Sequence, residues 1–207
     1  TVIGTAGADS LDGGAGNDII DYSALGGVTG ISVTLNGGVT STVTVTGGQN
    51  NTIVNFESLI GSAGDDIITG DGANNVLDGS SGADTLNGGA GNDTLSGSAG
   101  NDLFVASDGN DVMDGGINTD TVDYSASSGS AIAVTLNGAT DATVTVTGGD
   151  NDTVRNIENV TGTGGADVIT GDALDNFLRG LGSADTLAGG GGNDTLDGGA
   201  GNDTLDG

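Results

Sequence analysis

The chain has 207 residues, of which 29 are acidic and only two are basic, so its formal net charge is −27. A surface of that sign repels nucleic-acid phosphates, and no apolar run approaches the roughly 20 residues that span a bilayer, so we expect no nucleic-acid partner and no membrane insertion. Cys and His are absent, so any metal site must be built from oxygen ligands, which suit Ca²⁺ and Mg²⁺.

From its first residues onward, most of the chain consists of near-copies of a nine-residue segment. GGAGNDIID (13–21), GGAGNDTLS (88–96) and GGGGNDTLD (189–197) share the pattern G-G-x-G-x-D-x-U-x, in which U is a large apolar residue. The sixth position is Asp in twelve copies and Asn in the other two, at Asn75 and Asn176. In phase, fourteen nonapeptides start at Gly4, Gly13, Gly61, Gly70, Gly79, Gly88, Gly97, Ala106, Gly115, Gly162, Gly171, Gly180, Gly189 and Gly198.

Each nonapeptide divides into a turn and a short strand. The first six residues are mostly Gly, Ala, Asn and Asp, which favour turns, and the last three form a strand with one side chain pointing inward. Two nonapeptides then make one coil of 18 residues, and successive coils stack through parallel strands about 4.8 Å apart. We therefore predict an all-β fold, a right-handed parallel β-roll or β-helix solenoid, with the apolar eighth position as its core.

Two longer segments, 22–60 and 124–161, interrupt the nonapeptides and are similar to each other. Both open on Asp-Tyr-Ser-Ala, contain Thr-Val-Thr-Val-Thr-Gly-Gly and close on an acidic turn, at Glu57 or Glu158. Their Val/Thr alternation indicates strands, and we predict that each insert forms about two wider coils. The predicted organisation is one continuous solenoid, with the last two nonapeptides of a block at 1–21, an insert at 22–60, seven nonapeptides at 61–123, a second insert at 124–161 and five nonapeptides at 162–207.

Together, the blocks and inserts repeat with a period of about 101 residues, cut inside a nonapeptide block. Two interpretations stay open. The chain is a window from a longer array, or copies of it stack head to tail into a filament, because an uncapped solenoid end offers a heterologous interface.

The nonapeptide pattern resembles the calcium-binding repeat of the RTX family. The resemblance implies calcium-binding turns and about six or more bound Ca²⁺ ions. In that family one turn supplies its Asp and the carbonyl oxygens of positions 1 and 3, and the stacked turn supplies its Asp and those of positions 2 and 4. The aspartates that correspond to these ligands are Asp9, Asp18, Asp66, Asp84, Asp93, Asp102, Asp111, Asp120, Asp167, Asp185, Asp194 and Asp203. The carbonyl ligands that correspond are those of Gly13, Gly14, Gly16, Gly79, Gly82, Gly88, Gly89, Ala90, Gly91, Gly97, Ala99, Gly100, Gly189, Gly190, Gly191, Gly192, Gly198, Gly199, Ala200 and Gly201.

Stacking places each sixth-position Asp against its counterpart 18 residues later. Two carboxylates about 5 Å apart repel by about 0.8 kcal/mol in water, and by more where water is excluded. One buried apolar side chain per nonapeptide does not offset the cost of ordering the chain. We therefore predict that calcium binding and folding are one coupled event. The predicted sites are Asp66–Asp84, Asp84–Asp102, Asp102–Asp120, Asp93–Asp111, Asp167–Asp185 and Asp185–Asp203, with weak or no binding at Asn75 and Asn176.

The sequence predicts no enzyme. Nucleophile–base pairs need His, Cys or Lys, which are missing, and carboxylate pairs that recur in every repeat favour a structural role over glycoside cleavage. Two functions remain: an extracellular structural repeat of a bacterial cell surface (S-layer, adhesin stalk or filament), or the C-terminal calcium-binding module of a secreted RTX enzyme of the metalloprotease, lipase or alginate epimerase type. The resemblance implies, for both, export of the unfolded chain and folding in millimolar external calcium.

A few residues outside the repeat pattern carry predictions of their own. We expect Glu57 and Glu158 to accept hydrogen bonds in their turns rather than to act as an acid/base pair. Arg155 and Arg179 are predicted to form surface ion pairs, and Tyr22 and Tyr124 to fill the core where the coil widens.

Overall fold

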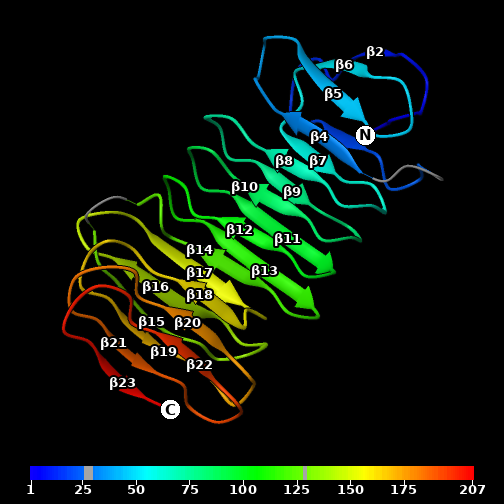
Figure 1. Cartoon of the computed structure of the whole chain (residues 1–207). Coiled ribbons are helices and arrows are strands. Elements are labelled where there is room, and N and C mark those ends of the chain that lie inside the picture. Colours follow the sequence, from blue (N-terminus) through cyan, green and yellow to red (C-terminus); the bar gives the residue numbers. More distant parts are fainter. Residues whose placement is uncertain (26–29, 128–129) are drawn as a thin grey trace.

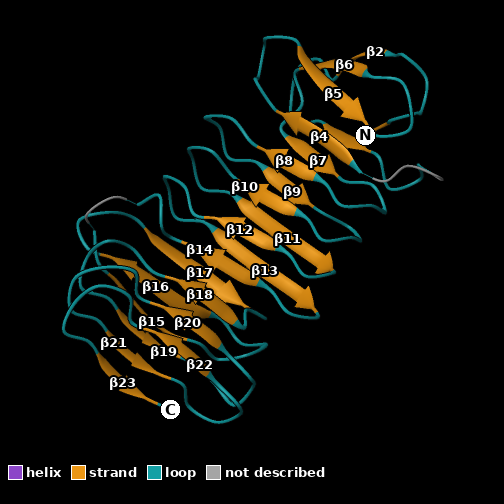
Figure 2. Cartoon of the chain, viewed as in Figure 1, coloured by secondary structure: helices purple, strands orange, loops and turns teal. Residues whose placement is uncertain are grey.

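The computed structural model describes residues 1–25, 30–127 and 130–207, so residues 26–29 of the first insert and 128–129 of the second lie outside the described part. Within those ranges all regular structure is strand, and no helix occurs (Figure 2). The described residues accordingly contain no helix that is long and apolar enough to cross a membrane. The prediction of an all-β solenoid built on parallel strands is confirmed.

The strands form two long sheets that face each other across a narrow core (Figure 1). The twelve-stranded sheet has the order β1 (Val2–Ile3), β3 (Ile19–Asp21), β7 (Ser58–Ile60), β9 (Val76–Asp78), β11 (Thr94–Ala99), β13 (Val112–Ile117), β17 (Asn151–Arg155), β16 (Ala142–Val146), β15 (Ile132–Thr135), β19 (Val168–Thr170), β21 (Thr186–Ala188) and β23 (Thr204–Asp206). The eleven-stranded sheet has the order β2 (Ser10–Asp12), β6 (Asn51–Val54), β5 (Ser41–Val45), β4 (Ile31–Thr34), β8 (Ile67–Thr69), β10 (Thr85–Asn87), β12 (Leu103–Val105), β14 (Thr121–Asp123), β18 (Asn159–Thr161), β20 (Phe177–Arg179) and β22 (Thr195–Asp197).

In the nonapeptide blocks the chain alternates between the sheets, one strand per nonapeptide. Each strand pairs in parallel with the strand 18 residues later, as Leu86 with Phe104 and Leu95 with Met113. This register stacks the apolar eighth positions into one continuous core. Eleven of them are buried: Ile20, Ile68, Leu77, Leu86, Leu95, Phe104, Met113, Val122, Ile169, Leu178 and Leu187. Leu11 and Leu196 are partly buried, and Leu205 in β23 is half exposed.

Each insert is a three-stranded antiparallel meander, which differs from the wider coils that the sequence led us to expect. In the first insert, Ile31 of β4 pairs with Val45 of β5, and Thr42 of β5 pairs with Thr52 of β6, both antiparallel. The chain reverses at glycines in the left-handed region, Gly37 (φ 50°) and Gly47 (φ 85°). Asn-Gly at 36–37 is a strong hairpin signal, and such a reversal prevents the segment from continuing the coil. The second insert repeats this with β15, β16 and β17.

The two meanders enter opposite sheets. The first adds β4, β5 and β6 between β2 and β8, while β3 and β7 remain neighbours in the other sheet. The second adds β15, β16 and β17 between β13 and β19, while β14 and β18 remain neighbours. Each insert thus adds two extra strands, about 10 Å, to one face only. The faces alternate because an odd number of nonapeptides, seven, separates the inserts. We therefore expect the two inserts to bend the solenoid axis in opposite directions.

The inserts carry a denser apolar core than the blocks. In the first, β4 buries Ile31 and Val33, and β5 buries Val43 and Val45. Tyr22, which precedes the first meander, is fully buried, and Tyr124 holds the same place in the second at 1% exposure. The prediction that these tyrosines fill the core is confirmed.

Candidate metal centre

The sixth-position aspartates stack into rows at the ends of the strands. Eight of them are no more than 2% exposed: Asp66, Asp84, Asp93, Asp102, Asp111, Asp120, Asp167 and Asp185. Asp9, Asp18, Asp194 and Asp203 are partly buried. In eight of these turns, Oδ1 of the Asp accepts the backbone N–H of the residue 18 positions earlier. Asp84, for example, donates to Asp102 at 2.8 Å, and Asp93 to Asp111 at 2.9 Å. The predicted pairs are therefore brought together.

Hydrogen bonding of the sixth-position side chain distinguishes two kinds of turn among nine of the fourteen. In the first kind, Oδ2 is buried and no group in the described residues donates a hydrogen bond to it; this holds for Asp84, Asp93, Asp102, Asp120 and Asp185. In all five of these turns the second position has a left-handed backbone: Ser80 (φ 76°), Gly89 (φ 94°), Ser98 (φ 72°), Gly116 (φ 98°) and Leu181 (φ 75°). We call these the open turns. An unpaired buried carboxylate oxygen is costly, so each open turn needs a positive partner.

Backbone geometry explains why the oxygen is left without a donor. The N–H of Ser80 donates to Oδ1 of Asp78 at 2.9 Å, and that of Gly89 to Oδ1 of Asn87 at the same distance. In these two turns the second-position N–H therefore donates to the last side chain of the preceding strand, and not to the sixth-position carboxylate. A Cβ at Gly97 would collide with Oδ2 of Asp102, so glycine is required where the carboxylate lies against the backbone.

In the second kind of turn the second-position N–H donates to the sixth-position side chain of its own turn. Ser62 donates to Oδ2 of Asp66 at 2.6 Å, and Thr163 to Oδ2 of Asp167 at 2.7 Å. Asp71 donates to Asn75 at 2.8 Å and Asp172 to Asn176 at 2.9 Å, in both cases to Oδ1. We call these four, at 61–66, 70–75, 162–167 and 171–176, the closed turns.

Both the oxygen and the nitrogen of the Asn75 and Asn176 side chains form hydrogen bonds within the chain. Their side-chain Nδ2 atoms donate to the backbone oxygens of Glu57, at 3.1 Å, and Glu158, at 2.9 Å. With Oδ1 accepting the second-position N–H, neither amide needs a metal ion. This geometry supports the expectation of weak or no binding at these two turns, which stays a prediction.

The rows continue through the inserts, which the nonapeptide pattern alone does not reveal. Glu57 Oε2 accepts the N–H of Asp18 at 2.8 Å, and Glu158 Oε2 that of Asp120 at 2.9 Å; the prediction that these glutamates accept hydrogen bonds in their turns is confirmed. Asn51 Oδ1 likewise accepts the N–H of Asp9 at 2.9 Å. Asn51 and Asp152 were not predicted from the sequence as members of the rows. The only sign of their role is that they occupy matching positions in the two inserts.

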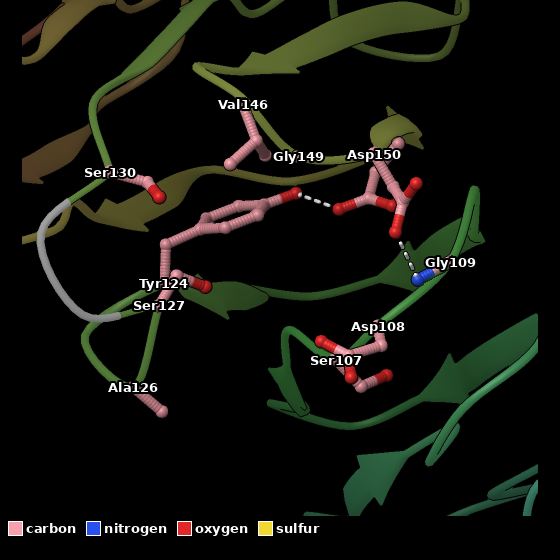
Figure 3. A pocket seen from close by; sticks show the side chains of 11 residues that line it. Ser107, Asp108, Gly109, Tyr124, Ala126, Ser127, Ser130, Val146, Gly149 and Asp150 are labelled. Atoms are coloured by element: carbon pink, nitrogen blue, oxygen red, sulfur yellow. Dashed lines mark hydrogen bonds between the residues drawn. The ribbon is translucent and has the colours of Figure 1, made fainter.

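Asp152 occupies that place in the second insert, where it meets the hydroxyl of Tyr124, the tyrosine labelled in Figure 3. Its Oδ1 accepts the N–H of Asp111 at 2.9 Å, and its Oδ2 accepts the hydroxyl of Tyr124 at 2.7 Å. A cavity of about 260 Å³ opens beside this pair, with Asp108 and Asp150 also in its lining. The residues that match these three near the first insert are neutral, Ala6, Gln49 and Asn51, so the first insert has no counterpart of this acidic lining.

Burial and neighbouring carboxylates hold the open-turn aspartates in a state that favours protonation. Burial, with Asp66 and Asp102 nearby, raises the pKa of Asp84 to about 7. Burial, with Asp102 and Glu158 nearby, raises the pKa of Asp120 to about 7. Burial raises the pKa of Asp93 to about 6. Each of these groups is stabilised by whatever neutralises it, a proton or a cation.

The two arginines lie outside the rows. Arg155 Nε is 2.8 Å from Oδ2 of Asp114, and Arg179 Nε is 3.2 Å from Oδ2 of Asp197. Both side chains are partly exposed, which confirms their prediction as surface ion pairs.

The donor set fits a hard divalent cation. It offers buried carboxylate oxygens and backbone carbonyls, with no nitrogen or sulfur ligand. The predicted carbonyl residues lie in stacked turns: Ala99 lies against Ser81 and Ala200 against Gly182, although the Ala99 oxygen already accepts the N–H of Gly82 at 2.9 Å.

Parallel coils with rows of buried carboxylates define a β-solenoid with cation-binding turns. The family model of the RTX calcium-binding nonapeptide repeat (4 copies) matches residues 1–24, 56–86, 87–122, 156–182 and 170–205, which is more than half of the chain. The chain belongs to this family, and its repeats bind Ca²⁺. Among curated proteins, no match was found.

Proposed function

We propose that the protein is a calcium-dependent, extracellular structural repeat protein that folds as it binds Ca²⁺ and forms or extends a surface array, adhesin stalk or filament. The observation that carries the proposal is the set of five buried carboxylate oxygens without a donor in the described residues, at Asp84, Asp93, Asp102, Asp120 and Asp185. Without a cation, the folded state holds buried like charges that the unfolded chain exposes to water.

The proposed carboxylate ligands are the open-turn aspartates and their partners in the same rows. Asp84, Asp102 and Asp120 form one row, Asp93 and its partner Asp111 a second, and Asp185 and its partner Asp203 a third. The carbonyls of the first four positions are proposed to complete the oxygen set. Bound Ca²⁺ supplies the positive charge that lets these carboxylates stack. The protein holds Oδ1 of each Asp by a backbone N–H, which fixes the direction of Oδ2.

The extracellular role follows from the calcium requirement. Sites of extracellular modules are typically tuned to about 10⁻⁴–10⁻³ M, so such a chain stays unfolded where calcium is scarce and folds outside the cell. A solenoid of this register grows by adding further coils to the same two sheets, which suits an array, a stalk or head-to-tail stacking of copies. In this proposal the protein acts as a scaffold.

Calorimetric titration of the purified chain with CaCl₂, after treatment with EGTA, tests the calcium-dependent part of this proposal. We expect several ions to bind with affinities in the range above, and Mg²⁺ to compete poorly because it demands a small octahedral site. No heat of binding would refute the proposal. Electron microscopy of the same samples tests assembly: calcium-dependent fibres or sheets support the array, and discrete short rods favour the module of a secreted enzyme.

A further inference from the structure

The closed turns occur at only one kind of place in the described chain, directly after an insert. The first pair, at 61–66 and 70–75, follows the first insert, and the second pair, at 162–167 and 171–176, follows the second. The open turns with an unpaired Oδ2 lie farther along the blocks, at Asp84 to Asp102 and at Asp185, and at Asp120 just before the second insert.

The first closed turn of each pair holds the first strand of the meander. Oδ1 of Asp66 accepts the N–H of Ile31 at 2.6 Å and the hydroxyl of Ser62 at 2.7 Å, while Oδ2 accepts the N–H of Ser62. Asp167 receives the N–H of Ile132 at 2.7 Å in the same way. Both oxygens of these buried carboxylates are therefore paired by protein donors, in contrast to the open turns.

The second closed turn holds the acidic turn that ends the meander. Asn75 Nδ2 donates to the backbone oxygen of Glu57, and the Glu57 side chain in turn accepts the N–H of Asp18. These bonds link three successive coils, those of Asp18, Glu57 and Asn75, through side-chain amide and carboxylate groups. Asn176 and Glu158 repeat the arrangement after the second insert.

The inserts also have the apolar burial that the blocks lack. A nonapeptide buries one large apolar side chain, whereas β4 and β5 bury two each, with Tyr22 and Phe56 packed at their ends. Burial of large apolar side chains is the dominant favourable contribution to folding. Polar pairing and apolar burial thus both favour folding of the insert without a metal ion.

We propose that each insert, with the two closed turns that follow it, is a folding unit that needs no calcium and serves as the base on which the calcium-dependent open turns assemble. The inference rests on the proposed function, because it divides the chain into calcium-dependent and calcium-independent parts. Parallel coils form as strands that lie far apart in the sequence pair with each other, one coil after another. A sheet edge that is already formed at β8 or β19 supplies the strand with which the next coil pairs.

Hydrogen exchange followed by mass spectrometry on the full chain, in EGTA and in millimolar CaCl₂, tests the inference. In EGTA we expect peptides within 31–60 and 132–161 to exchange about tenfold or more slowly than the unfolded chain, and peptides within 85–105 to exchange at the unfolded rate. Unfolded-rate exchange of 31–60 and 132–161 in EGTA would overturn the inference and leave the proposed function standing. Protection of 85–105 in EGTA would instead overturn the proposed function.

Two matched variants compare a closed turn with an open turn, because each changes one sixth-position Asp to Asn. Asp66→Asn places an amide N–H₂ group against a backbone N–H donor in a closed turn. Protection of residues 31–60 from hydrogen exchange in EGTA should therefore fall, while the number of calcium ions bound stays unchanged. Asp102→Asn should lower calcium stoichiometry or affinity and leave protection of 31–60 in EGTA unchanged. If Asp66→Asn lowered calcium stoichiometry instead, the closed turns would be ion sites and the inference would be wrong.

Discussion

Oδ1 of Asp102 lies 2.8 Å from the backbone nitrogen of Asp84 and accepts its hydrogen bond, while Oδ2 of the same carboxylate is buried with no donor among the described residues. One oxygen therefore fixes the position of the side chain, and the other is available to a cation. The repetition of this relationship every 18 residues converts a turn sequence into a row of sites.

Asp93→Ala should destabilise the calcium-bound protein more than Asp123→Ala. Asp93 is buried and its Oδ1 accepts the N–H of Asn75 at 2.7 Å, so its removal costs a buried hydrogen bond, about 1–3 kcal/mol, and a cation ligand. Asp123 is half-buried and accepts the N–H of Ser125, so its loss should cost under about 1 kcal/mol. Thermal melts in millimolar calcium measure the difference, and equal losses would contradict the ligand assignment.

Without calcium, acid should stabilise the folded protein. The folded-state pKa is about 7 for Asp84 and Asp120 and about 6 for Asp93, against an ordinary value of 3.8. The folded state therefore binds more protons between about pH 4 and pH 7, so stability is greatest near pH 4 and is lost as the pH rises through 6 to 7. Far-UV circular dichroism in EGTA should show more sheet at pH 4.5 than at pH 7.5.

With calcium present, the sign reverses, because protons compete with the ion for the same oxygens. Calcium affinity should weaken as the pH falls below about 7. An affinity independent of pH between 5 and 7.5 would count against the buried aspartates as ligands.

Tyr124→Phe should destabilise the protein more than Tyr22→Phe. The Tyr124 hydroxyl donates to the buried carboxylate of Asp152 at 2.7 Å, and its removal leaves Oδ2 without that donor, at a cost of about 1–3 kcal/mol. The Tyr22 hydroxyl instead accepts a longer bond, 3.3 Å, from the neutral amide of Asn51, so we expect a loss of about 1 kcal/mol or less. Denaturant unfolding in calcium compares the two, and equal losses would show that the charged pair adds nothing.

Deletion of one nonapeptide, 88–96, should change the shape of the molecule and preserve its calcium-dependent fold. Six nonapeptides would then separate the inserts, and both meanders would enter the same sheet. Two bends in one direction would give a curved rod, whereas we expect the two bends of the natural chain to oppose each other. Small-angle X-ray scattering in calcium measures the maximum dimension of the molecule. We expect it to decrease by more than the length of the deleted half coil. A decrease equal to that length would refute the idea that the two inserts bend the axis in opposite directions.

The sequence predicted the coil, the core and the rows because those features follow from strict periodicity. The eighth positions from Ile20 to Leu187 are buried, as the 18-residue register requires. The antiparallel inserts were not predicted, although Asn36-Gly37 and Asn137-Gly138 carry a hairpin signal, because Val/Thr alternation suits a strand of either direction. The difference between open and closed turns was not predicted either, because Ser62 and Ser80 both occupy the second position of a turn, yet only Ser80 has a left-handed backbone.

Far-UV circular dichroism of the purified chain at pH 7.5, recorded while free Ca²⁺ is raised from EGTA-buffered to millimolar concentration, tests the coupling of folding to calcium most directly. We predict a large, reversible gain of β-sheet signal that Mg²⁺ at the same concentration does not produce. A full sheet spectrum that is already present in EGTA and unchanged by calcium would contradict it.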